Sequence, residues 1–110
     1  MDRIHYSGDS ILTGSEIARA LLDYAGALAA TNGSETVVIP CLHADGTTGS
    51  VRLLVGPASQ IISSTEDSEH DELIDASLVA EFDQQTSRLR SANVAGLADP
   101  IAYTEEFDDL

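Results

Sequence analysis

Three histidines stand close to carboxylates along the chain, which is the first pattern to test for a metal site. They are His5 with Asp9, His43 with Asp45, and His70 inside the acidic segment 66–72. The segment offers the oxygen ligands that Ca²⁺ and Mg²⁺ accept, but counted from Asp67 its sixth position is Glu72, where an EF-hand loop needs Gly. One cysteine and scattered histidines do not give a zinc spacing. We therefore expect solvated carboxylates here and assign no metal or cofactor residue.

The candidate nucleophiles lack the groups that would activate them. Cys41 and His43 share a strand face, but no third group is implied that would orient the histidine as a base. Ser59 lies outside any Gly-x-Ser-x-Gly pattern, and the chain has no P-loop. We therefore assign no catalytic residue and expect a protein that is not an enzyme.

The segment Gly56-Pro57-Ala58-Ser59 is the most distinctive loop of the sequence. Its residues are those of a turn between strands, with Pro57 fixing its own φ angle. The alternative is that these small residues form the rim of a ligand pocket.

The first third of the chain predicts a strand followed by a helix. Residues 3–6 form a short β candidate that ends in the turn-forming cluster Ser7-Gly8-Asp9-Ser10. Thr13 and Glu16 fit a capping box, and apolar residues then recur at helical spacing. Asn32-Gly33 is a left-handed stop. We expect a helix over residues 14–30.

The middle of the chain predicts three strands in a meander, over residues 36–42, 51–55 and 60–65. Pro40 within the first of them indicates an edge or a bulge. A second helix is expected from about residue 69 to residue 92. It is capped within residues 68–71, and its apolar face is formed by Ile74, Leu78, Phe82 and Leu89.

The predicted fold class is α+β, with the order β-α-β-β-β-α and an antiparallel sheet of three or four strands packed by two helices. The sequence of 110 residues suits one domain, which we place at residues 1–92. Residues 93–110 are expected to form an acidic C-terminal tail. The tail is either extended or docked on the sheet or on a dimer mate.

The charge of the chain restricts its partners. The sequence has nineteen acids and five arginines, a formal net charge of −14, and thirteen of the acids lie between Glu66 and Leu110. Such a surface repels the phosphates of nucleic acids and of anionic lipids. We expect neither nucleic acid nor a membrane as a partner, and a basic protein surface as a possible one.

Both faces of the predicted sheet carry apolar side chains, which a sheet with one wet face would not show. Val37, Ile39 and Cys41 point one way, whereas Val38 and Leu42 point the other. The two helices either cover one face each or share one face and leave the other for a second subunit. Since two-fold dimers are the commonest oligomers, we predict a homodimer formed through the sheet or its edge.

Three functions remain open from the sequence. The first is a small, acidic, non-enzymatic module for protein interaction. We expect it to be bacterial, because the absence of lysine with heavy use of Ala, Asp and Arg is common in high-GC bacteria, and cytoplasmic, because residues 1–5 do not begin a signal peptide. The second is a small-molecule-binding or metabolic enzyme domain, with a pocket between sheet and helices that gathers Tyr6 and either His5 or His43. The third is mimicry of nucleic acid by the acidic second helix and tail, in which Asp71, Glu72 and Asp75 make only a short run of carboxylates.

Overall fold

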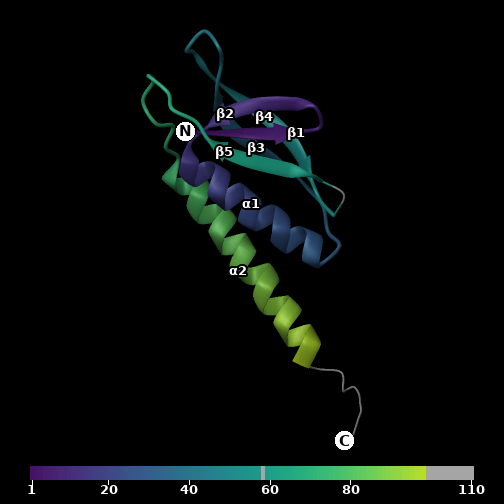
Figure 1. Ribbon diagram of the computed structural model, residues 1–110. Helices are drawn as coiled ribbons and strands as arrows, with labels where there is room; N and C mark the ends of the chain where they lie inside the picture. Colours follow the sequence, from purple (N-terminus) through teal and green to yellow (C-terminus); the bar gives the residue numbers. More distant parts are fainter. Residues whose placement is uncertain (58, 99–110) are drawn as a thin grey trace, which may run out of the picture.

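A computed structural model describes residues 1–57 and 59–98, with side chains up to residue 92. The fold class is α+β, as predicted, with five strands and two helices. The elements are β1 (Asp2–Tyr6), β2 (Asp9–Thr13), α1 (Ser15–Ala30), β3 (Glu35–Leu42), β4 (Thr48–Val55), β5 (Ile61–Thr65) and α2 (Ala76–Ala98). Figure 1 shows the strands at one end of the molecule and the two helices side by side beneath them.

The predicted order lacked one strand, because β1 and β2 form a hairpin across residues that we expected to be a longer turn. Ser7 and Gly8 both have positive φ angles, 55° and 87°. Two such residues form the tight turn whose twist matches that of paired strands. Tyr6 therefore lies opposite Asp9, and the chain returns along β1 as far as Thr13.

The capping box predicted at Thr13 is wrong, although the helix that follows is confirmed. Thr13 is fully buried at the end of β2, and its hydroxyl donates to the carbonyl of Pro40 at 2.7 Å. Gly14 is the N-cap residue of α1 and supplies no side-chain hydrogen bond to its first turn. At the other end the predicted stop is confirmed, since Asn32 has a φ of 60° and the Gly33 N–H donates to the Leu28 carbonyl.

The strand order β4-β3-β2-β1-β5 makes the predicted meander wrong, because β5 pairs with β1 at the edge opposite β4. In a flat sheet these edges would lie about 19 Å apart. Residues 56–60 connect them through a folded turn, in which the Ser59 N–H donates to the Gly56 carbonyl at 3.1 Å. The sheet must therefore curl until its edges approach. The Tyr6 hydroxyl, on the strand β1 beside β5, donates to the Leu54 carbonyl of the edge strand β4.

Pro40 lies in β3, which is not an edge strand as its proline suggested. β3 pairs with β4 along its whole length but meets β2 at a single bridge, Leu12 opposite Leu42. The missing N–H of Pro40 therefore costs no ladder hydrogen bond on the β2 side.

The core lies between the sheet and α1. Successive side chains of the strands point to opposite faces, so that Ile4, Ile39 and Val55 are fully buried against Ile17 and Leu21 of α1. α2 packs on α1, with Phe82 stacked on Tyr24 at a centroid distance of 5.4 Å. Both helices thus lie on the same side of the sheet (Figure 1).

α2 begins later than predicted, at Ala76 rather than near residue 69. The cap is Asp75, whose carboxylate accepts the Leu78 N–H at 3.1 Å. Ser68 instead closes a local turn by accepting the His70 N–H. α2 continues to Ala98, past the predicted domain end at residue 92, and the rest of the predicted tail lies outside the described residues.

Candidate functional site

A cavity of about 640 Å³, which we call the edge cavity, lies where the two edges of the curled sheet approach each other. Its wall combines the tip of the β1–β2 hairpin with the β4–β5 turn. The residues that define it most clearly are His5, Tyr6, Leu54, Gly56, Pro57 and Ile62. His5 and Tyr6 were both named from the sequence, and the small-residue loop does line a cavity. The cavity nevertheless lies between strands, not between sheet and helices, and His43 is not part of it.

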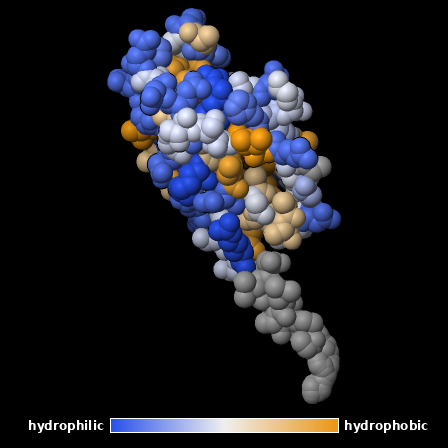
Figure 2. Space-filling view, in the orientation of Figure 1, coloured by the Kyte–Doolittle hydropathy of each residue, from blue (hydrophilic) through white to orange (hydrophobic). Residues whose placement is uncertain are grey.

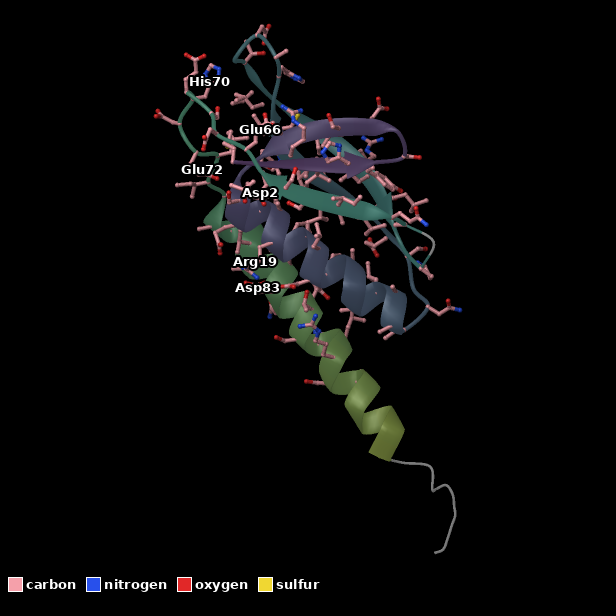
Figure 3. The ribbon with its side chains drawn as sticks, viewed as in Figure 1. Asp2, Arg19, Glu66, His70, Glu72 and Asp83 are labelled. Atoms are coloured by element: carbon pink, nitrogen blue, oxygen red, sulfur yellow. The ribbon has the colours of Figure 1, made fainter. Side chains whose placement is uncertain are left out.

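His43 and His70 line a second cavity of about 460 Å³, beside the turn between β3 and β4. An added Cβ on Gly46 would lie 2.9 Å from the imidazole of His70, which shows how closely this segment covers the turn (Figure 3). Cys41 is a free, buried thiol on the core side of β3. Among the residues that the structure describes, no three His, Cys, Asp or Glu side chains are grouped to hold a metal ion.

Two carboxylates of the segment between β5 and α2 bind the start of the chain. Glu66 accepts hydrogen bonds from Nε and Nη2 of the Arg3 guanidinium, each at 2.8 Å, and this hydrogen bonding lowers the pKa of Glu66. Glu72 accepts the Ser15 N–H at 2.6 Å and the ammonium of Met1 at 2.9 Å, and these donors lower its pKa in turn. Glu72 therefore accepts a hydrogen bond at the N-terminus of α1, the role that the sequence had assigned to Thr13.

Asp71, Glu72 and Asp75 all lie before α2 rather than on it, so they do not form the helix-borne row of carboxylates that mimicry of nucleic acid would use. Residues 99–110 of the tail, the other part of that hypothesis, lie outside the described residues. We do not propose that function.

A groove of about 480 Å³ runs between the first turns of α1 and α2. Its apolar lining comes from Ile17, Leu73, Ile74, Ala76, Val79 and Ala80. The side chain of Ile74 is 81 % exposed, the highest value among the large apolar residues left open. We refer to this feature as the α1–α2 groove.

Four carboxylates line the same groove, from Glu16, Glu72, Asp75 and Asp83, and no basic residue does. Arg19 lies next to it and pairs with Glu16 at 3.2 Å and with Asp83 at 3.1 Å. Figure 3 shows Glu72, Arg19 and Asp83 along the junction of the two helices. The groove is therefore an apolar floor with an anionic rim.

The outer face of the sheet, opposite the core, is the other open apolar surface. Val38 is 52 % exposed, Leu54 58 % and Ile62 65 %. Leu54 is a diagonal neighbour of Val38 across β3 and β4, and it lines the edge cavity together with Ile62. Figure 2 shows apolar side chains gathered among hydrophilic ones on the face in view.

β5 carries Ile62 at the edge of the sheet. It pairs with β1 on one side and with no other strand in the described part of the chain. Its residues, Ile61 to Thr65, include no charged side chain, unlike the other four described strands. An uncharged edge strand with free backbone groups is a template for a further strand.

The sequence predicted a dimer interface at the sheet or its edge but did not identify β5 as that edge, and it did not identify the α1–α2 groove. Ile74 had been interpreted as one position of the apolar face of the second helix. The signal available for Ile62 was the run of five uncharged residues in a strongly acidic chain. None of the helices in the described part of the chain is long and apolar enough to cross a membrane.

Comparison with known proteins adds no assignment: the chain matches no protein-family model, no curated protein and no solved structure.

Proposed function

We propose that this chain is a non-enzymatic protein-interaction module that works as a homodimer, with two copies paired along β5. The observation that carries the proposal is that α1 and α2 share one side of the sheet, so that Leu54 and Ile62 stay exposed on the other. Of the two arrangements open from the sequence, this is the one that leaves a surface for a second subunit.

The edge strand β5 is better suited than the edge strand β4 to form the dimer interface, and we call the interface along β5 the β5 seam. β4 carries Arg52, and its Leu54 carbonyl already accepts the Tyr6 hydroxyl. β5 has no charge, so it is the edge at which two copies of a chain with a net charge of −14 approach with the least repulsion. Antiparallel pairing of β5 with its own copy satisfies the free backbone groups and gives an isologous interface.

Ile62 supplies the apolar contact in this arrangement. It points to the outer face beside His5, its partner across β1 and β5. On pairing, the two copies of Ile62 lie close to the two-fold axis and remove each other from water. A charge at this position would place like charges against each other across the seam, which destabilises paired strands.

The test is the dimer dissociation constant of Ile62→Asp, measured by sedimentation equilibrium beside wild type. We expect a dimeric wild type and at least a tenfold, and up to about a hundredfold, weaker dimer in the variant, the equivalent of about 1.4–2.8 kcal/mol. Val38→Asp is the matched control, because it places the same charge on the outer face away from β5 and should change the constant little. A monomeric wild type, or dissociation by Val38→Asp alone, would contradict pairing along β5.

We further propose that the partner of the dimer is a basic protein and that the module acts in the cytoplasm. The net charge of −14 supports the first statement. The buried free thiol of Cys41 suits the second, since reducing compartments keep thiols unpaired.

A second candidate function, binding of a small molecule, is favoured by the cavity that brings His5 and Tyr6 together with the Gly56–Pro57 turn. An imidazole and several hydroxyls on an apolar wall are the elements of a ligand pocket. Native mass spectrometry of the purified protein tests it. A retained mass in wild type that is lost in His5→Ala would favour this function, and an unmodified mass in both would oppose it.

A further inference from the structure

We infer that the α1–α2 groove binds a basic segment of a partner protein, which inserts an aliphatic side chain beside Ile74 while its cations meet the carboxylates of the rim. The inference deepens the proposed function, because it rests on this chain being an interaction module and states what it binds.

The floor of the α1–α2 groove is apolar. Ile17 is buried, whereas Ile74 is 81 % exposed above a cavity of about 480 Å³. Residues 72–75 are not helical. A helix through them, as predicted from the sequence, would have placed Ile74 on the same apolar face as Leu78. Gly14 contributes to the non-helical conformation, since a Cβ on Gly14 would lie 1.9 Å from the Leu73 carbonyl oxygen. The exposed isoleucine is therefore fixed by its backbone, and a volume of this size accepts one or two aliphatic side chains.

The carboxylates of the groove rim favour a basic partner. Glu16, Glu72, Asp75 and Asp83 line the groove. Arg19 pairs with Glu16, Asp83 and Asp23, and the Met1 ammonium pairs with Glu72, so that the four carboxylates of the rim meet two cations and keep an excess of negative charge. A second copy of this acidic chain, or an anionic ligand, would be repelled from this rim. A segment that carries Lys or Arg on both sides of a Leu or Ile is complementary to both the floor and the rim.

The dependence on salt concentration distinguishes binding in the α1–α2 groove from dimerisation along β5. Attraction between exposed opposite charges is screened within about 10 Å at 0.1 M salt, so that binding in the groove weakens as salt rises. The β5 seam joins two chains of like charge, so that its dimer strengthens under the same change.

The probe is the synthetic peptide acetyl-Arg-Arg-Leu-Leu-Arg-Arg-amide, titrated into ¹⁵N-labelled protein. We expect the largest chemical-shift changes at residues 15–17 and 73–80 and a severalfold loss of affinity between 50 and 200 mM salt, on the order expected for exposed charges. A peptide with Ser in place of both Leu should bind about tenfold more weakly or worse. Equal binding of the two peptides, or shifts spread over all acidic segments, would overturn the inference.

Two exposed isoleucines provide matched variants. Ile74→Ser should weaken binding of the leucine peptide about tenfold and leave the dimer unchanged, whereas Ile62→Ser should weaken the dimer and leave peptide binding unchanged. Both positions are exposed, so that neither change removes core packing. Unchanged peptide binding in Ile74→Ser overturns the groove alone. A stable dimer in Ile62→Ser counts against the proposed seam alone.

Discussion

The two open apolar surfaces of this molecule, the β5 edge and the α1–α2 groove, differ in what surrounds them. Each exposes one isoleucine, Ile62 by 65 % and Ile74 by 81 %. No charged side chain stands within β5, whereas four carboxylates line the groove. The first surface therefore suits an identical chain, and the second suits a chain of opposite charge.

The comparison shows that the net charge of −14 does not by itself define a partner. What matters is where the charge is absent. In our proposal, copies of this acidic chain meet along the uncharged strand β5, and a basic partner binds in the α1–α2 groove, where carboxylates border an apolar floor.

The largest effect is expected from removing the contact between Phe82 and Tyr24, which holds α2 to α1. This change should impair the α1–α2 groove but not the β5 edge. Phe82 is buried and stacks on Tyr24 at 5.4 Å, so Phe82→Ala should lower the free energy of unfolding by about 3–5 kcal/mol. Chemical denaturation measures this loss. Because the groove is built from both helices, peptide binding should fall with it, while the folded fraction should still dimerise through β5. Equal loss of both activities in the folded protein would mean that the two surfaces are coupled.

A smaller effect is expected from Gly14→Ala, which perturbs the groove through its backbone. The added Cβ would meet the Leu73 carbonyl oxygen at 1.9 Å, so the segment that carries Ile74 must shift. Overpacking of this kind costs about 1–3 kcal/mol, measurable by thermal or chemical unfolding. Gly26→Ala in the same helix is the control, since nothing lies within 4 Å of its added Cβ and it should stabilise α1 by about 0.5–1 kcal/mol. Equal effects of the two changes would contradict the close approach.

The smallest effect is expected from Glu72→Gln, at about 1 kcal/mol near neutral pH, the usual contribution of a helix-terminal acceptor. Donors from Ser15 and Met1 lower the pKa of Glu72 in the folded chain. Its contribution is therefore present above the unfolded pKa of about 4.3 and is lost as the pH falls through the folded pKa.

The stability difference between wild type and Glu72→Gln should accordingly shrink as the pH is lowered from 6 to 3. Glu69→Gln serves as the control, because Glu69 is exposed. A difference that does not change with pH would show that the charge of Glu72 contributes nothing at the start of α1.

Local pattern predicted those parts of the fold that depend on local interactions. The apolar spacing of α1 and the left-handed residue Asn32 predicted the helix and its end, and the β-branched runs predicted β3, β4 and β5. The hairpin at Ser7-Gly8 was missed because a serine with a positive φ angle is uncommon, so that the pair was interpreted as part of a longer turn. Strand order was missed because the curl of the sheet, which allows residues 56–60 to join opposite edges, is a tertiary property.

The groove could not have been predicted, because it depends on contacts between residues far apart in the sequence. Residues 69–75 have helical spacing and acids suited to a first turn, which is why we predicted a helix there. Glu72 instead binds Ser15, 57 positions away, and Leu73 lies against Gly14. These contacts hold Ile74 out of the helix, and they appear only when the two segments are placed together.

The measurement that tests the central claim most directly is hydrogen exchange of the protein above and below its dimer dissociation constant. Pairing along β5 predicts that amides of residues 61–65 are protected at high concentration and exchange faster on dilution, while amides of β4, at the opposite edge, stay unchanged. Exchange in β5 that does not depend on concentration, or a change confined to β3 and β4, would contradict the account.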